Sequence, residues 1–550
     1  MPWLFQAAGF LAVEIVALFC GMCGTSFCKL FSKRKSMIQR DGALTSLWQA
    51  TTTKSKESYI SNRMLAGDEP FDVVIVGGGI TGVSTGLLLQ EAGFRCIILE
   101  ANSLCFGTTG GTTAHLNTIL DTPYPTIEKN FGQEKAALVA RAVEEAIGLI
   151  WSNCKKYSID AELETQTAYL FSQTDEQTVE LEEIRKVSAD LGVKLEYTDQ
   201  LPVSLHKQKV LAIYGQAKFH PTRYVFGMAR AFQALGGRII EQCRVTDAEN
   251  NETITVHTDS GDINCSYLIY ATHIPPGVNI LNTRCAPYRS YAMALTLKGE
   301  YPDGLIYDMY DPYHYYRTQV IDGKPYLIAG GEDHKTGHMT NTHTCFMKLE
   351  SYVRAHFRVD EIKHRWSSQY FEPVDGLPYI GHLPGEPGNI LVATGFGGNG
   401  MVYSGVAALM FRDLLLKSSE KYVAVFDPNR LKPVAGFSNF VRENVDVAKK
   451  WVGKFLPAEK LESFAGLAPG EGRVVKVEGE TIALYKTEEG ELVALAPTCT
   501  HMGCHVTWNN MEKSWDCPCH GARYAIDGTV LTGPADMDLE KISLASLVEK

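Results

Sequence analysis

The sequence predicts a protein of at least two domains, an α/β domain that opens with a βαβ unit and a small all-β domain near the C-terminal end. The chain has 550 residues, which is too long for a single hydrophobic core. An apolar run, a glycine-rich turn, a helical stretch and a second apolar run follow one another in residues 71–102. Residues 472–498 read as three short strands separated by Glu-Gly turns.

The composition is that of an ordinary globular protein, with 45% hydrophobic and 21% charged residues. The net charge of −11 argues against a nucleic-acid partner, because binding phosphates requires a basic face. Half of the 14 cysteines are scattered singly, which is typical of buried thiols in a reducing compartment. We therefore expect a cytoplasmic protein that does not bind nucleic acid.

Residues 1–36 differ from the rest of the chain. The apolar stretch at residues 3–28 is long enough to cross a bilayer as a helix, and basic residues follow it at once. That charge pattern would hold the globular domains on the cytoplasmic side. The segment is therefore either a membrane anchor or an extension ahead of a start at Met37. Residues 37–69 are polar and predict a loosely held lead-in.

The βαβ unit carries a dinucleotide-binding fingerprint, G-x-G-x-x-G, at Gly77, Gly79 and Gly82. These glycines permit a tight turn, a close approach of the backbone to a pyrophosphate, and contact between helix and strand. Glu100 ends the second apolar run and is placed to accept hydrogen bonds from ribose hydroxyls. An acid at this position also disfavours a 2′-phosphate.

Two further glycine-rich segments favour FAD over NAD. The first, CFGTTGGTTAHL at residues 105–116, contains Thr108 and Thr109. In the second, the apolar strand NILVAT runs into glycines and then a helix of small residues. A second helix N-terminus aimed at a ligand suits a cofactor long enough to span the domain. The glycines of this second segment are Gly395, Gly397, Gly398 and Gly400.

Four cysteines and two histidines gather in CTHMGC at residues 499–504 and CPCHGARY at residues 517–524. Zinc is the ordinary metal for two cysteines and two histidines. However, each loop here alternates the two residue types, and Cys504 and Cys519 would have no role in a zinc site. A two-iron cluster with two cysteines on one iron and two histidines on the other uses this pattern. The ligand-type spacings are Cys499-x-His501 and Cys517-x-x-His520.

The pattern resembles the Rieske [2Fe–2S] proteins, specifically the cytochrome bc-type branch. The resemblance implies that the cluster ligands are Cys499, His501, Cys517 and His520. It also implies a disulfide between Cys504 and Cys519, which joins the two loops. In that family the segment corresponding to residues 533–535 is a proline loop that covers the cluster. The histidines are then expected at the tip of the domain, where a quinone or a small redox protein could dock.

Two residues near the cluster bear on its potential. Tyr524 matches a usual hydrogen-bond donor of the family, whereas Ala522 stands where the family often has serine. The missing hydroxyl should lower the potential, because hydrogen bonds to the cluster sulfurs raise it. We expect an intermediate potential.

The glycine-rich segments resemble the D-amino-acid oxidase and glycine oxidase superfamily of FAD-dependent oxidoreductases, over residues 71–428. The resemblance implies an antiparallel sheet, inserted into a Rossmann-like FAD-binding domain, that covers the flavin and forms the substrate domain. It also makes Arg317 a candidate clamp for a substrate carboxylate. The alternative for Arg317 is a surface arginine on an edge strand. A covalent link from FAD to His115 is not expected, because its register does not match.

The whole arrangement resembles a bacterial family of Rieske-containing FAD-dependent oxidoreductases over residues 40–550. The expected domains are the FAD domain at 70–430, a linker helix at 431–458 and the Rieske domain at 459–550. The implied activity is oxidation of a small amine or amino-acid-like substrate, with electrons passing through the cluster to a quinone or redox protein. Two alternatives stay open, an oxygen-using oxidase with a structural cluster and a redox sensor without turnover.

Overall fold

The computed structural model describes residues 39–52, 69–430, 443–447, 449–450, 459–460, 466–477 and 479–544. The predicted membrane anchor at residues 3–28 lies outside these ranges. Within them, no helix combines the length and apolar character needed to span a membrane. Most of the predicted linker helix at 431–458 also lies outside, and its described residues 443–447 and 449–450 are helical.

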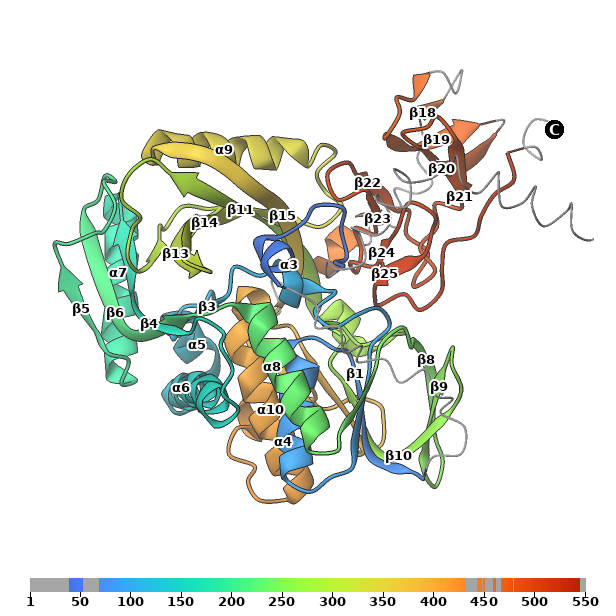
Figure 1. The fold of residues 1–550 in the computed structure, drawn as a ribbon, viewed down its shortest axis with the longest axis horizontal. Coiled ribbons are helices and arrows are strands. Elements are labelled where there is room, and N and C mark those ends of the chain that lie inside the picture. The colour runs from blue at the N-terminus through green and yellow to red at the C-terminus, as the bar shows by residue number, and fades with distance from the viewer. Residues whose placement is uncertain are drawn as a thin grey trace, which may run out of the picture.

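A largely parallel sheet forms the core of the α/β domain, at the bottom of Figure 1. Its order is β16-β17-β10-β1-β2-β7, and the hairpin β8–β9 extends it beside β10. The central strands are continuous apolar runs, as expected for a parallel sheet covered on both faces. The strands are β1 (Phe71–Val76), β2 (Cys96–Leu99), β7 (Arg238–Ile240), β8 (Val245–Asn250), β9 (Ile254–Thr258), β10 (Ile263–Tyr270), β16 (Tyr379–His382) and β17 (Ile390–Thr394).

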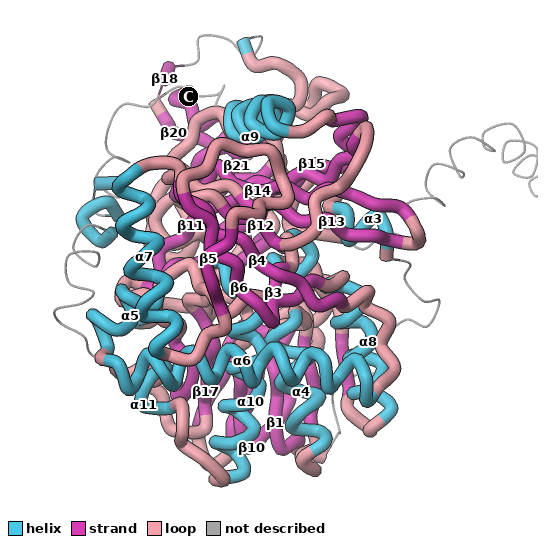
Figure 2. Tube along the Cα trace, turned by 90° about the vertical axis from the view of Figure 1, so that its left-hand side faces the viewer, coloured by secondary structure: helices cyan, strands magenta, loops and turns pink. Residues whose placement is uncertain are grey.

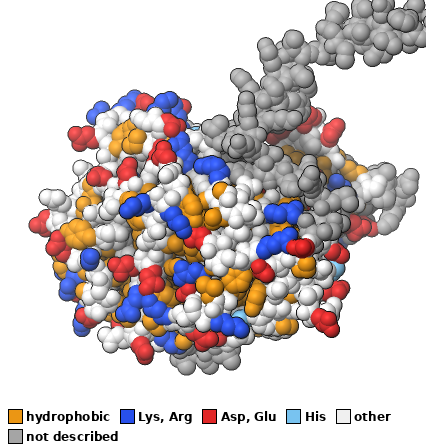
Figure 3. Space-filling model, turned by 60° about the horizontal axis from the view of Figure 1, so that its bottom comes forward, with side chains coloured by type: hydrophobic (Ala, Val, Ile, Leu, Met, Phe, Trp, Pro, Cys, Tyr) orange, Lys and Arg blue, Asp and Glu red, His pale blue; other side chains and the backbone are white. Residues whose placement is uncertain are grey.

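A layer of helices packs against this sheet (Figure 2). Its members are α4 (Ile80–Glu91), α8 (Pro221–Ala234) and α10 (Gly400–Leu416), with the short α11 (Val423–Phe426) beside β16. Helix α6 (Gln133–Lys156) packs against α10. Helices α4 and α10 lie side by side and both begin in glycine-rich turns at the carboxyl ends of strands. On the surface of this half, seen from below in Figure 3, acidic and basic side chains are interspersed between small apolar patches.

A second, nine-stranded sheet covers the upper side of the α/β domain (Figure 1), and its order is β15-β11-β14-β13-β12-β4-β6-β3, with β5 on β6. All its pairs are antiparallel except β4 with β12. The predicted antiparallel substrate domain is therefore confirmed. The strands are β3 (His115–Leu116), β4 (Glu164–Ser172), β5 (Leu195–Thr198), β6 (Lys209–Lys218), β11 (Cys285–Leu297), β12 (Leu305–Tyr307), β13 (Tyr315–Ile321), β14 (Lys324–Lys335) and β15 (Val359–Pro373). The helices beside it are α5 (Tyr124–Phe131), α7 (Asp175–Asp190) and α9 (His343–His356).

The C-terminal domain consists of two four-stranded sheets, as predicted for an all-β domain. One sheet contains β18 (Glu459–Lys460), β19 (Gly472–Val477), β20 (Glu480–Lys486) and β21 (Leu492–Leu495). The other contains β22 (Thr507–Asn509), β23 (Ser514–Asp516), β24 (Arg523–Tyr524) and β25 (Val530–Thr532). The CTHMGC loop joins the two sheets, and the CPCHGARY segment forms the loop between β23 and β24 and ends in β24 itself. In Figure 1 this second sheet faces the end of β15 and the lead-in.

The lead-in is firmly packed where the structure describes it. Helix α3 (Leu47–Thr51) begins at Ser46, which forms a capping box with Gln49. Leu47 and Trp48 are fully buried, and Trp48 Nε1 donates to Thr112 O at 2.5 Å. The prediction of a loosely held segment is therefore wrong for residues 39–52, because its apolar and charged side chains fill the junction between the domains.

Candidate functional site

The turn between β1 and α4 has room only for glycine. Gly77 has a φ of +114°, and a Cβ there would lie 2.5 Å from Ala271 O. A Cβ at Gly82 would lie 1.9 Å from Gly77 O. The turn therefore brings the first turn of α4 against the strand end, where its backbone N–H groups can meet a phosphate. The backbone N–H of Ile80 donates to Thr109 Oγ1 at 3.1 Å.

Glu100 is held at the carboxyl end of β2, as predicted. The N–H of Gly78 donates to Glu100 Oε2 at 2.7 Å, and the N–H of Asn102 donates to Oε1 at 2.8 Å. Burial raises the pKa of this carboxyl group, and these two bonds oppose the shift. The carboxylate therefore has a fixed orientation beside the cavity.

A cavity of about 300 Å³ extends from Glu100 to a group of tyrosines under the antiparallel sheet. Two of the predicted glycines, Gly82 and Gly395, do not line the cavity. Gly82 allows the close contact of α4 with the turn, and Gly395 packs against Cys285, whose Sγ would lie 3.1 Å from a Cβ at this position. Its length and its two glycine-rich helix N-termini fit an extended dinucleotide. The predicted residues that line the cavity are Gly77, Gly79, Glu100, Thr108, Thr109, Gly397, Gly398 and Gly400.

Arg317 does not reach this cavity. Its side chain on β13 is fully buried and stacks over the ring of Trp48 at 5.2 Å. Its nitrogens donate to Thr113 O at 2.6 Å, Gln319 Oε1 at 2.7 Å and Phe219 O at 3.1 Å. The prediction of a carboxylate clamp is therefore wrong, because the guanidinium is committed to protein oxygens behind the cavity wall. The alternative of a surface arginine is wrong as well.

The far end of the cavity contains two carboxyl groups that the sequence did not single out, Asp121 and Asp333. Burial raises the pKa of Asp121 to about 6 and that of Asp333 to about 7. Perturbed carboxyl groups in a cleft are typical of functional sites. The tyrosines that surround them are Tyr307, Tyr313, Tyr315 and Tyr370.

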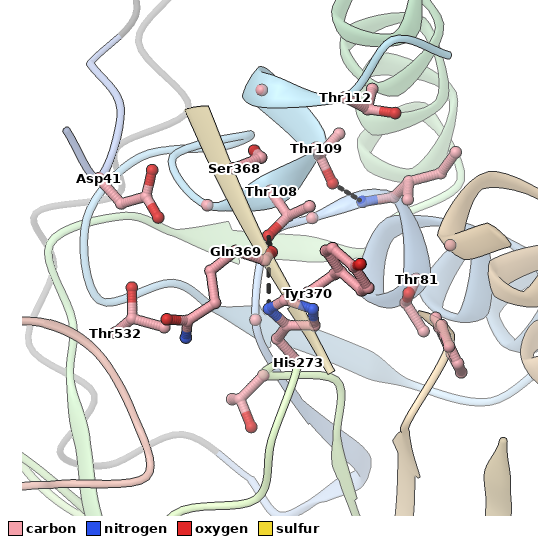
Figure 4. Close-up of a pocket in the computed structure, with 18 of the residues that line it drawn as sticks. Asp41, Thr81, Thr108, Thr109, Thr112, His273, Ser368, Gln369, Tyr370 and Thr532 are labelled. Atoms are coloured by element: carbon pink, nitrogen blue, oxygen red, sulfur yellow. Dashed lines mark hydrogen bonds between the residues drawn. The ribbon is translucent and has the colours of Figure 1, made fainter. Parts of the chain in front are cut away.

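Strand β15 crosses the cavity wall between this site and the C-terminal domain (Figure 4). Gln369 and Tyr370 point to opposite sides of the strand, and Gln369 points toward Thr532. The hydroxyl of Thr108 donates to Gln369 O at 2.9 Å and lies 3.3 Å from His273 Nδ1. Gln369 Nε2 in turn donates to Gly521 O at 2.8 Å.

The four predicted cluster ligands converge in the C-terminal domain. The rings of His501 and His520 are 5.0 Å apart, and the thiols of Cys499 and Cys517 contact each other. In the described part of the chain, the buried Nδ1 atoms of both histidines have no hydrogen-bond partner. Burial lowers the pKa of His520 to about 4, which favours the neutral imidazole that binds metals. Two thiols and two free ring nitrogens at one point fit a [2Fe–2S] cluster.

Other features of the two loops agree with the prediction. Cys504 and Cys519 form the disulfide, with their Cα atoms 6.5 Å apart. Tyr524 Oη lies 3.2 Å from Cys499 Sγ, where its hydroxyl can donate to the sulfur. Ala522 is fully buried and offers no hydroxyl.

The histidine side of this centre faces the FAD domain. His501 Nε2 lies 3.2 Å from Gly277 O, and the Gly277 N–H donates to Pro534 O at 3.1 Å. His520 is buried, and a Cβ on the next residue, Gly521, would lie 2.7 Å from Pro287 Cβ. The expectation of a histidine tip open to an external partner is wrong for His520, which is buried at the antiparallel sheet, whereas His501, beside the loop after β10, stays partly exposed.

Comparisons with known proteins agree with this geometry. Residues 72–414 match the family described as FAD dependent oxidoreductase (DAO), and residues 460–543 match the Rieske [2Fe-2S] domain. A relative described as putative Rieske 2Fe-2S iron-sulfur protein YhfW, from Bacillus subtilis (strain 168), is 34% identical over 497 residues. That alignment covers 90% of this chain and 97% of the relative.

More distant relatives match the FAD domain. Gamma-glutamylputrescine oxidoreductase from Escherichia coli (strain K12) is 25% identical, and the alignment covers 64% of this chain and 85% of the relative. The crystal structure of glycine oxidase from Geobacillus kaustophilus superposes with a TM-score of 0.56 at 16% identity. That superposition covers 66% of this chain and 100% of the oxidase, and it shows a shared fold.

The cofactors that these families use are FAD and a [2Fe–2S] cluster, and residues suited to both are present. The chain belongs to the DAO family of FAD-dependent oxidoreductases and carries a Rieske [2Fe–2S] domain at its C-terminal end.

Proposed function

We propose that this protein oxidises a small amine or amino-acid-like substrate and passes the electrons singly through the Rieske cluster to an external acceptor, a quinone or a redox protein. Oxidation of a carbon–nitrogen bond to an imine removes one hydrogen from carbon and one from nitrogen, which amounts to two electrons and two protons. FAD supplies a site that takes an electron pair, whereas a [2Fe–2S] centre carries one electron at a time. Each substrate therefore requires two transfers to the acceptor.

The contact between the cluster ligands and the cavity wall carries this proposal. Thr108 lines the cavity, and its hydroxyl donates to the backbone oxygen of Gln369. The side-chain amide of Gln369 donates to the backbone oxygen of Gly521, the residue that follows His520. A second contact joins His501 to Gly277, whose neighbour Pro276 lines the cavity. Both histidine ligands are thus a few bonded steps from the flavin cavity. Such a short, buried and hydrogen-bonded connection supports electron transfer between the two centres.

The potentials typical of Rieske centres also support this direction. They span roughly −150 to +300 mV, well above plant-type ferredoxins near −400 mV. The Tyr524 hydroxyl raises the potential, and Ala522 provides no second donor. For one electron, about 59 mV corresponds to a tenfold change in the equilibrium constant, so a modest gap makes the transfer effectively forward.

The external acceptor cannot reach His520 while the two domains are packed as described. It has to approach the cluster at the partly exposed edge of His501, or the Rieske domain has to undock. Electrons can leave the cluster by either route, and an artificial acceptor can replace the natural one in the experiment below.

Stopped-flow spectroscopy under anaerobic conditions tests the proposal. The flavin is reduced by light in the presence of EDTA, and an artificial one-electron acceptor is then added to the wild type and to a His520→Ala variant. In the wild type we expect the cluster to bleach after the flavin and both to be reoxidised rapidly. In the variant the flavin should be reoxidised slowly.

Two outcomes would contradict the proposal. Equal flavin reoxidation in the two proteins would remove the cluster from the electron route. Reoxidation of the wild-type flavin by oxygen but not by the one-electron acceptor would indicate an oxidase with a structural cluster. A Met502→Ala variant is the control for changes to the loop itself, because Met502 is 43% exposed and adjoins His501.

A further inference from the structure

The tyrosine end of the cavity is acidic. Asp121 and Asp333 line it, and among the described lining residues the only arginine is Arg244 and there is no lysine. Arg244 belongs to the opposite end, where it lies beside Val245 and its Nη2 donates to Val530 O at 2.9 Å. A substrate at the tyrosine end therefore meets two carboxyl groups and no balancing cation from the wall.

Asp333 has one oxygen that is available to a substrate. Its Oδ2 accepts from the Tyr370 hydroxyl at 2.9 Å. Its Oδ1 is buried and has no partner within hydrogen-bond distance in the described part of the chain, and the nearby Ser290 hydroxyl lies 3.0 Å from Tyr315 Oη. A buried carboxylate oxygen without a donor is costly, so the site favours a ligand that supplies one.

Asp121 is already hydrogen-bonded to protein groups, and His115 carries no charge. Asp121 Oδ2 accepts from the Gly398 N–H at 2.9 Å, and Asn399 also bonds to its side chain. His115 Nε2 lacks a partner among the described residues, but burial lowers the pKa of His115 well below its ordinary value. His115 is therefore neutral and adds no positive charge for an anionic ligand.

We infer that the substrate is a cationic amine that carries no carboxylate on its reacting carbon, with Asp333 Oδ1 accepting from its ammonium group. The rings of Tyr313 and Tyr315, 5.5 Å apart, provide an aromatic wall for the cation and its apolar substituents. α-Amino acids are excluded, because their carboxylate would lie near Asp121 and Asp333 and Arg317 cannot reach it. The inference rests on the proposed function only in taking this cavity as the substrate site.

Three small ligands of matched shape test the inference without any turnover. Tert-butylammonium, pivalate and 2-aminoisobutyrate share one branched carbon and differ in carrying the amine, the carboxylate or both. The two amines have no hydrogen on the carbon that bears the nitrogen, and pivalate has no nitrogen, so none of the three can be oxidised to an imine. Binding to the holoenzyme is measured by calorimetry and by the perturbation of the flavin absorption bands.

We expect tert-butylammonium to bind at least tenfold more tightly than either of the other two. An Asp333→Asn variant should lose at least tenfold in affinity for tert-butylammonium and should not weaken pivalate. Unchanged flavin content and an unchanged Rieske electron-resonance spectrum show that this variant is folded. Asp333→Glu should recover part of the affinity.

Several results would overturn the inference. In the wild type, pivalate or 2-aminoisobutyrate could bind as tightly as tert-butylammonium, or tert-butylammonium could fail to bind. In the variant, Asp333→Asn could leave the affinity for tert-butylammonium unchanged. These equilibrium measurements do not involve the cluster. A failure of the proposed electron route appears instead in the photoreduction experiment, so the two failures can be told apart.

Discussion

At the scale of single residues, His501 offers its two ring nitrogens to different partners. Nε2 faces Gly277 O of the FAD domain, and Nδ1 is buried without a partner among the described residues, near the cysteine thiols. A protonated Nε2 that donates to a carbonyl group leaves Nδ1 as the ligating atom. One histidine thus holds the metal centre and anchors the domain contact.

Replacing His501 by alanine should abolish the Rieske electron-resonance signal, because one iron would lose half of its histidine ligands. Flavin content should stay the same, since His501 does not line the cavity. The measurement is electron resonance of the dithionite-reduced protein together with iron analysis. Met502→Ala is the matched control in the same loop. An unchanged electron-resonance signal in His501→Ala would show that His501 is not a cluster ligand.

The affinity for a cationic amine should depend on pH through Asp333, whose pKa burial raises to about 7. The groups that face it are Tyr370 and Glu372 on β15, Ser290 on β11, Asp121 and His314. An alkylammonium stays charged across this range, as lysine does with a pKa of about 10.4.

The ionised form of Asp333 binds the cation, so affinity for tert-butylammonium should rise as the pH increases from 5.5 through 7 and level off about one pH unit above the pKa. Calorimetric titrations at each pH measure this, and Asp333→Asn should give a flatter profile. A wild-type affinity that falls with rising pH would contradict the assigned partner.

A residue's role could be predicted from the sequence where neighbouring residues along the chain determine it, and not where the placement of a strand determines it. Cysteine and histidine spacings within two loops define the cluster, because all four ligands come from short segments. Arg317 and Asp333 differ only in where their strands place them. Neither β13 nor β14 has a pattern that tells which side chain faces the cavity and which faces Trp48.

At the scale of elements, the β1–α4 turn could be predicted from the sequence, whereas strand β15 could not. The turn was predicted because a fixed glycine spacing is needed wherever a helix starts so close to a strand. Strand β15 was not, since VDEIKHRWSSQYFEP has exposed acids and bases along its first half and no steady alternation. It forms because β11 pairs with it over nearly its whole length.

Gly82→Ala should prevent FAD binding. A Cβ there would lie 1.9 Å from the backbone oxygen of Gly77, so α4 has to shift away from β1 and the turn loses its shape. The matched control is Gly148→Ala in α6, where a Cβ meets nothing within 4 Å. In a helix interior that change should stabilise by about 0.5–1 kcal/mol.

The measurement is the ratio of flavin to protein after purification, read from the absorption spectrum. We expect Gly82→Ala to be purified nearly free of flavin while the cluster is retained, and Gly148→Ala to contain a full complement of both cofactors. Full flavin occupancy in Gly82→Ala would show that the turn can open without loss of the site.

At the scale of the whole molecule, a buried network of charges fixes the Rieske domain against the rest of the chain. Asp516 accepts from Arg289 on the antiparallel sheet at 3.1 Å and from Arg523 in its own domain at 3.1 Å. Arg523 also pairs with Asp41 of the lead-in at 2.6 Å, and Arg40 pairs with Glu512 at 2.7 Å. The domain order was predictable from motifs, whereas this docking was not, because its partners are far apart in sequence.

The strength of the docking can be tested by replacing Arg523 with alanine. Arg523 is fully buried, and its loss leaves Asp41 paired with Arg40 alone and Asp516 paired with Arg289 alone. Breaking a buried pair costs about 3–5 kcal/mol when the remaining charge has no partner, so the retained arginines make this the upper limit here. The control is Arg354→Ala on α9, whose exposed pair with Glu350 contributes only about 0.3–0.5 kcal/mol.

Thermal unfolding is followed at the flavin absorption and at the visible circular dichroism of the cluster, and Arg523→Ala should lower the midpoint of the cluster signal far more than Arg354→Ala.

The stability difference should also depend on pH through Asp516. Burial alone would raise the pKa of Asp516, but Arg523 and Arg289 lower it below the ordinary value. Its contribution to stability is therefore present above the unfolded-state pKa of about 3.9 and lost as the pH falls through the lower folded value. The difference between wild type and Arg523→Ala should accordingly be full at pH 7 and shrink below about pH 4. Equal midpoints for the two variants at pH 7 would mean that the network does not hold the domains together.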